Sequence, residues 1–133
     1  MKFKAEFLIK LKKDGSKEAV DAFIEEFWEN TTHNPFSNRE RVWQNVAGIE
    51  CVKWEGCIHL SFIRSFEKGT GAGSAALKWL CQLADKHGVP IELHAKPVGK
   101  GGLTANKLRE WYMRHGFKSN GSKYDLIRQP KIG

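Results

Sequence analysis

The sequence predicts one α/β or α+β domain, a mixed, mostly antiparallel central sheet with helices on both faces. Its 133 residues suffice for one hydrophobic core, and hydrophobic residues make up an ordinary 41% of them. Strand-like alternation and helix-like periodicity follow one another along the chain. Two strand-like stretches are joined by a two-residue turn, as in antiparallel hairpins, whereas later strands are separated by helices, as in crossover connections.

The chain is expected to begin with a strand and a helix. Residues Phe3–Lys12 alternate apolar and charged side chains, which predicts a half-buried strand. Ser16 is expected to cap a helix over Lys17–Glu29, because its side chain can accept a hydrogen bond from the first turn and apolar residues then recur at helical spacing.

The next stretch allows two interpretations. Asn30–Pro35 is polar and ends in Asn-Pro, so a loop is expected there. The S-x-x-E spacing of Ser37–Glu40 has the form of a capping box and favours the start of a short second helix. Arg41–Val46 fits an extended strand equally well.

A hairpin and a glycine run follow. Ile49–Trp54 and Cys57–Arg64 are expected to be strands joined by the turn Glu55-Gly56. Beyond the glycines, Ser74–His87 has helical periodicity, and Gly88 stands where a left-handed residue ends a helix.

The remaining elements alternate between strands and a helix. Thr104 can cap the helix, and Gly116 follows it. The expected elements are a strand over Ile91–Ala95, a loop over Pro97–Gly102, a helix over Ala105–His115, and short strands over Phe117–Lys118 and Tyr124–Arg128 around the turn Asn120–Ser122.

Charge and cysteine content limit the function classes. The net charge of +7 favours an anionic partner, such as a polyphosphate, nucleic acid or acidic protein surface, or serves solubility alone. Cys51, Cys57 and Cys81 match no zinc or disulfide spacing, so we expect reduced thiols, no bound metal and a cytoplasmic location. No stretch is apolar enough for a membrane span.

The glycine run Lys68–Ser74 predicts a site for phosphate. A strand that turns through glycines into a helix leaves several backbone N–H groups pointing at one place, where the helix dipole adds about half a positive charge. The run lacks the Lys-Ser/Thr of a Walker A loop and the spacing of a dinucleotide fingerprint. A glycine-rich turn without a ligand is the other interpretation.

Two segments together resemble the GNAT superfamily of acyl-CoA N-acyltransferases. Lys68–Gly73 is similar to the family's [Q/R]-x-x-G-x-[G/A] motif, with Lys at the first position. Asn106, Tyr112 and Gly116-Phe117 are similar to the second motif, in the family's fourth helix. The resemblance extends over Cys57–Arg128.

This resemblance implies that the protein is an N-acetyltransferase that uses acetyl-CoA as co-substrate and transfers the acetyl group directly to a primary amine. Tyr112 would protonate the leaving thiolate, although it could instead be a core tyrosine. Asn106 would bind the pantetheine arm. The implied cofactor-binding residues are the strand end Ile63, Arg64 and Ser65, near the thioester, and the loop residues Lys68, Gly69, Thr70, Gly71, Ala72, Gly73 and Ser74, near the pyrophosphate.

The sequence does not decide which residue deprotonates the amine. Glu92, His59 and His94 are candidates, and Glu50 is a fourth. Trp28, Phe36 and Trp43 line an acceptor pocket in one interpretation and pack against the sheet in the other.

The acceptor and the oligomeric state are open too. The acceptor is expected to be a small molecule or another protein, and nucleic acid is a possible but not favoured partner. The chain itself is expected to be a monomer or a homodimer. The alternative function is a non-catalytic protein of the same fold that binds nucleic acid or an acidic protein.

Overall fold

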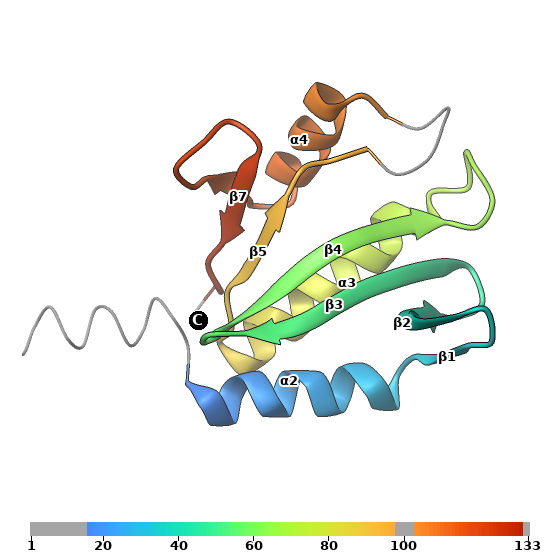
Figure 1. The fold of residues 1–133 in the computed structure, drawn as a ribbon, viewed down its shortest axis with the longest axis horizontal. Helices are drawn as coiled ribbons and strands as arrows, with labels where there is room; N and C mark the ends of the chain where they lie inside the picture. Colours follow the sequence, from blue (N-terminus) through green and yellow to red (C-terminus); the bar gives the residue numbers. More distant parts are fainter. Residues whose placement is uncertain (1–15, 98–102, 132–133) are drawn as a thin grey trace, which may run out of the picture.

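The structure is a computed structural model that describes residues 16–97 and 103–131. In these ranges it forms three helices and one sheet of seven strands, an α+β fold (Figure 1). The expected strand Phe3–Lys12 and most of the expected loop Pro97–Gly102 lie outside the described residues.

The sheet is mixed and mostly antiparallel, as predicted. Its strand order is β1-β2-β3-β4-β5-β7-β6, and only β4 and β5 pair in parallel within the described residues. The strands are β1 (Thr32–Asn34), β2 (Ser37–Trp43), β3 (Ala47–Trp54), β4 (Cys57–Ser65), β5 (Ile91–His94), β6 (Lys118–Ser119) and β7 (Asp125–Arg128).

The expected capping residues Ser16, Thr104 and Gly88 are confirmed, but the helix expected from Ser74 begins at Ala72, with Gly71 as its N-cap. The helices are α2 (Lys17–Glu29), α3 (Ala72–His87) and α4 (Ala105–Arg114). The Ser16 Oγ accepts a hydrogen bond from the Ala19 N–H at 3.1 Å, and the Thr104 Oγ1 accepts one from the Lys107 N–H at 3.3 Å. Gly88 ends α3 with φ +68°, the left-handed conformation that glycine adopts without strain.

The three described helices share one face of the sheet. Phe27 of α2 and Trp43 of β2 both stack on Trp79 of α3. At the other end of the sheet, Arg128 of β7 reaches both Asp85 of α3 and the carbonyl that follows α4. In residues 16–97 and 103–131, helices therefore cover one face of the sheet, whereas the sequence predicts helices on both faces.

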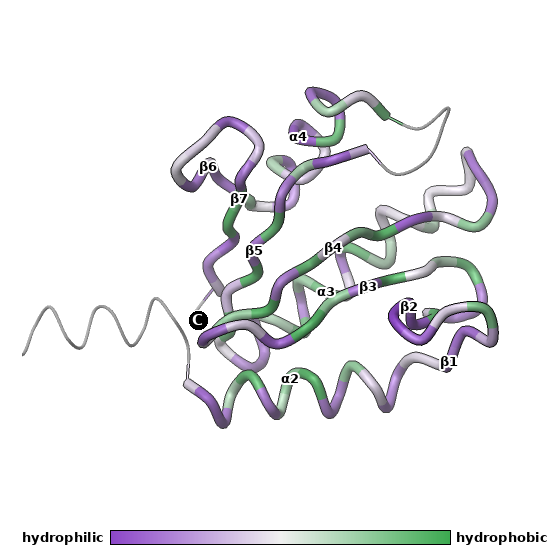
Figure 2. The backbone as a smooth tube through the Cα atoms, viewed as in Figure 1, coloured by the Kyte–Doolittle hydropathy of each residue, from purple (hydrophilic) through white to green (hydrophobic). Residues whose placement is uncertain are grey.

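The opposite face of the sheet, which we call the outer face, is more polar. Along β4, the buried residues Ile58, Leu60 and Ile63 alternate with the more exposed His59, Ser61 and Arg64, and hydrophobic and hydrophilic residues follow one another along this strand in Figure 2. The strand β3 is instead buried at its start and exposed at its end. Val52 and Trp54 of β3 remain 50% and 57% exposed. Among the described residues, no helix packs on the outer face.

The structure decides between the interpretations before β3. The expected loop contains β1, the helix expected from Ser37 is absent, and the extended alternative is confirmed by the strand β2, which includes Arg41–Trp43. The Ser37 hydroxyl does accept hydrogen bonds from the N–H groups of Arg39 and Glu40, as a capping residue would. The Glu40 side chain, however, is buried against Asn34 and Arg64, and that distant arginine favours the strand.

The aromatic residues of this region have different surroundings. Trp43 is buried in the core, in agreement with the packing interpretation. Trp28 and Phe36 are 56% and 95% exposed, and neither lines the main cavity described below. They therefore support no acceptor pocket.

Candidate functional site

The parallel strands β4 and β5 separate from one another at the centre of the sheet. Their pairing comprises Ile58 with Ile91 and His59 with Glu92. Beyond His59, β4 continues to Ser65, while β5 pairs with β7 on its other edge (Figure 1). This leaves one edge of β4 unpaired within the described residues, with backbone groups that can bind an extended ligand.

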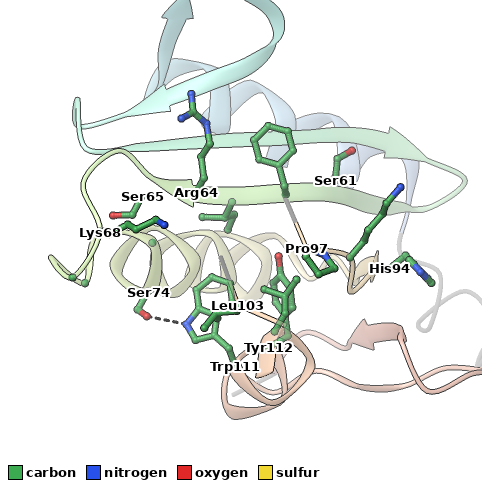
Figure 3. A pocket seen from close by; sticks show the side chains of 17 residues that line it. Ser61, Arg64, Ser65, Lys68, Ser74, His94, Pro97, Leu103, Trp111 and Tyr112 are labelled. Carbon is green, nitrogen blue, oxygen red and sulfur yellow. Dashed lines mark hydrogen bonds between the residues drawn. The ribbon is translucent and has the colours of Figure 1, made fainter. Parts of the chain in front are cut away.

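A cavity of about 560 Å³ occupies this opening. The end of β4, the glycine run, the first turn of α3, the end of β5 and one side of α4 surround it (Figure 3). Its described lining residues are Ser61, Phe62, Ile63, Arg64, Ser65, Lys68, Gly69, Gly71, Gly73, Ser74, His94, Lys96, Pro97, Leu103, Leu108, Trp111 and Tyr112.

One end of the cavity is built to bind an anion. Gly71 is the N-cap of the 16-residue helix α3, with φ +77°, and provides no side-chain cap. The Ala72 N–H donates to the Thr70 Oγ1 at 3.4 Å, and the other N–H groups of the first turn can bind an anion. Gly69 also has a positive φ, +79°. The Thr70 hydroxyl donates to the Glu67 carbonyl at 2.8 Å, which holds the loop in this shape.

The charges of the cavity are of one sign. Lys68 and Lys96 are among its lining residues, and no Asp or Glu is present among the described ones. Arg64 also lines the cavity, but its side chain points away, and its guanidinium binds Glu40 with the Nη2–Oε1 distance at 2.8 Å (Figure 3). Hydrogen bonding to Glu40 raises the pKa of Arg64. The ammonium groups of two lysines therefore line the cavity, whereas the guanidinium of Arg64 binds Glu40 outside it.

Tyr112 is a buried ionisable residue among those that line the main cavity. It is 3% exposed and packs against Trp111 and Phe117, while its hydroxyl points into the cavity (Figure 3). Burial raises the pKa of Tyr112, with a smaller contribution from Cys81. No hydrogen bond joins this hydroxyl to the described part of the chain. The phenol is therefore protonated and available to a ligand.

Several lining residues were missed by the sequence-based prediction. A β-bulge leaves Ser61 as an extra residue, because Leu60 pairs with Cys51 and Phe62 with Glu50. No local pattern marks this bulge. Trp111 also lines the cavity and donates from Nε1 to the Ser74 Oγ at 2.8 Å, which ties α4 to the first turn of α3. In the sequence, the position of Trp111 next to Tyr112 on the apolar side of the helix indicates that Trp111 could line the same cavity.

Some predicted site residues lie elsewhere. Thr70 and Ala72 belong to the loop but do not line the cavity, and Asn106 does not line it either. The Asn106 Oδ1 accepts a hydrogen bond from the Tyr124 hydroxyl at 2.7 Å. Glu50 lines neither this cavity nor the second one described next.

The remaining candidate bases meet at a smaller cavity of about 220 Å³. His59 lies 3.4 Å from Glu92 (Nδ1–Oε1), and His94 lies 2.7 Å from Asp125 (Nδ1–Oδ1). All four residues line this second cavity. Among them, His94 lines the main cavity as well.

The three cysteines lie apart from this chemistry. Cys51, Cys57 and Cys81 are thiols, and none of them lines either cavity. Burial raises the pKa of Cys81 to about 11, so this thiol is protonated at neutral pH. In the part of the chain that the structure describes, no cluster of three His, Cys, Asp or Glu residues is arranged to hold a metal ion. No helix there could cross a bilayer.

Comparison with known proteins identifies one similar fold. No family model and no curated protein matches this chain. Among solved structures, the chain is similar to the "Crystal structure of Anti-CRISPR protein AcrVA5", with a TM-score of 0.57 and 19% identity. The match covers 65% of this chain and 93% of that one.

These findings correct the family assignment. The GNAT superfamily resemblance is wrong as an identification, because no family model matches and the supported likeness is to AcrVA5. At 19% identity that likeness concerns the fold alone. What the comparison establishes is an α+β fold with a mixed, mostly antiparallel sheet, resembling AcrVA5.

Proposed function

We propose that this protein is an N-acetyltransferase that uses acetyl-CoA and acts on a primary amine of another protein. The observation that supports it best is the separation of β4 from β5, which opens a cavity between a free strand edge and the uncapped start of α3. The likeness to a structure named as an anti-CRISPR protein supports the choice of a protein acceptor.

The size and the chemistry of the cavity support acetyl-CoA as its ligand. Ligand sites typically enclose about 300–1,000 Å³, and this cavity encloses about 560 Å³. The N–H groups of the first turn of α3, with Lys68 beside them, would hold the phosphates. The unpaired edge of β4 would hold the amide groups of the pantetheine arm as an added strand does. Acetyl-CoA would supply the acetyl group as an activated thioester.

The residues between the two ends of the cavity suit acyl transfer. The bulge at Ser61 leaves backbone groups of β4 outside the sheet ladder, and an N–H there would stabilise the oxyanion that forms when an amine attacks. Tyr112 keeps its proton at Oη at neutral pH and would donate it to the departing sulfur. The apolar side chains of Leu103 and Leu108 would exclude water from the same space.

The test combines binding with turnover. Titration with acetyl-CoA by calorimetry should show one site, and the variant Gly71→Glu should lose it, because a carboxylate would stand at the anion end. Release of CoA thiol should then depend on an added amine acceptor. Absence of binding at millimolar acetyl-CoA would refute the proposal.

The net charge of +7 favours one alternative, a non-catalytic protein that binds an acidic partner. Binding of random-sequence DNA or of an acidic protein at 0.2 M salt, without acetyl-CoA affinity, would support that alternative.

A further inference from the structure

The second cavity differs from the main one in charge. It lies on the outer face of the sheet and contains the carboxylates of Glu92 and Asp125, whereas no acidic residue is among the described residues of the main cavity. A cationic amine is therefore attracted to the second cavity and repelled by Lys68 and Lys96 in the first. Opposite charges at the two sites separate an anionic co-substrate from a cationic acceptor.

His94 lies between the main cavity and the second cavity. Among the described residues, it alone lines both cavities. Figure 3 shows His94 at one end of the main cavity and Lys68 at the other, with Tyr112 between them. A ligand whose phosphates lie near Lys68 would therefore extend towards His94.

The tautomer of His94 follows from its partner. The Asp125 carboxylate accepts a hydrogen bond from the Ser122 hydroxyl at 2.6 Å and lies 2.7 Å from His94 Nδ1. The bond from Ser122, followed by that from His94, lowers the pKa of Asp125. Because a carboxylate only accepts, Nδ1 holds the ring hydrogen. In the neutral ring Nε2 has the lone pair, and it makes no hydrogen bond to the described residues.

Other charged groups surround this ring. Glu92 from β5 and His59 from β4 line the same cavity, and Lys96 follows on the same chain segment as His94. The His59–Glu92 contact is longer, 3.4 Å, and His59 does not line the main cavity. His94 is therefore both better oriented and nearer to the site of transfer. Its side chain is 57% exposed, so a proton that it accepts can pass to water.

We propose that the second cavity receives the primary ammonium group of the acceptor, and that Nε2 of His94, oriented by Asp125, removes its proton. In this step one N–H bond of the ammonium breaks, an Nε2–H bond forms, and the amine nitrogen keeps the electron pair with which it attacks. The imidazolium then releases the proton to water. The inference rests on the proposed function, because it concerns the same reaction.

The first measurement needs no co-substrate. Addition of n-propylamine hydrochloride to the protein at constant pH should shift the ring NMR signals of His94. The signals of His33 and His87, which line neither cavity, should not move. Equal movement of all histidines, or none for His94, would overturn the assignment of the amine site.

The second measurement follows the pH dependence of kcat/KM for a lysine-containing peptide. His94→Gln should lower it by about 100-fold at pH 7, and the loss should shrink as pH approaches the amine's own pKa of about 10.4. Asp125→Asn should give a smaller loss with the same pH trend, and the control His33→Gln, at a histidine that lines neither cavity, a change below about threefold. Full activity of His94→Gln, or a loss that is equal at every pH, would overturn the role of His94.

Calorimetry with acetyl-CoA separates the two proposals. The His94→Gln variant should still bind acetyl-CoA, because the phosphates would lie at the opposite end of the cavity, near Lys68. If the wild type does not bind acetyl-CoA, the proposed function itself fails. If binding is intact while the His94 predictions fail, only the inference about the amine site is overturned.

Discussion

The substitution Tyr112→Phe separates catalysis from stability in this fold. Tyr112 is 3% exposed, and its hydroxyl has no hydrogen-bond partner among the described residues. Phenylalanine would keep the ring contacts with Trp111 and Phe117. Since a typical hydrogen bond contributes about 1 kcal/mol and none is lost here, the free energy of unfolding should change by less than about 0.5 kcal/mol.

Turnover should respond much more strongly. A positioned general acid contributes about 10²–10⁴-fold to rate, which corresponds to about 2.7–5.4 kcal/mol of transition-state stabilisation. Burial raises the pKa of Tyr112, so its proton is present across the neutral range and the loss in Tyr112→Phe should be the same at each pH in that range. Acetyl-CoA affinity should stay unchanged, because in the proposed reaction the hydroxyl acts only on the leaving sulfur.

Tyr124, the other of the two tyrosines, is the matched control. Its hydroxyl donates to Asn106 at 2.7 Å, so Tyr124→Phe should lower the free energy of unfolding by about 0.5–1 kcal/mol and keep kcat. Urea unfolding, thiol-release kinetics and calorimetry on both variants complete the test. The reasoning is refuted if Tyr112→Phe retains full kcat, or if it unfolds more easily by over about 1.5 kcal/mol.

Three further predictions concern stability, and urea unfolding checks each. Gly71→Ala meets no atom within 4 Å but must adopt φ +77°, so it should cost about 1–2 kcal/mol without any packing defect; no measurable cost would contradict the positive φ. Asp85→Asn leaves the buried Arg128 without its carboxylate partner and should cost about 3–5 kcal/mol. Burial works to raise the pKa of Asp85, but hydrogen bonds from Arg128 and the Lys131 N–H hold it below its usual value. The wild type should therefore have this contribution in full above about pH 4 and lose it as pH falls through the lower folded pKa, a dependence that Asp85→Asn should lack. Phe27→Ala removes a ring that stacks on Phe23 and Trp79 and should cost about 3–5 kcal/mol, and a cost below 1 kcal/mol would show that the site collapses.

Local chemistry in the sequence was enough for most elements. Ser16, Thr104 and Gly88 mark helix ends because capping involves residues only a few positions apart, and the structure confirms all three. The turn Glu55-Gly56 is confirmed as well, with φ of +34° and +82°.

Distant contacts explain where local reasoning failed. Glu40 completes a helix-start pattern with Ser37, yet it is buried in a strand because Arg64, far along the chain, pairs with it. A local pattern cannot include a partner that only sheet pairing brings close. Local patterns also cannot predict how many helices cover each face of the sheet, because that depends on how the whole chain connects the strands.

The sequence by itself determined the order of most elements, the glycine run that starts α3, and the helix that contains Tyr112, because periodicity, capping and turn chemistry are local. Only the tertiary structure decided that β4 and β5 part after His59, that Ser61 forms a bulge, and that His94 borders both cavities. Those features depend on strand register and on which edges meet. The choice of His94 over His59 and Glu92 as the proposed base therefore required the folded protein.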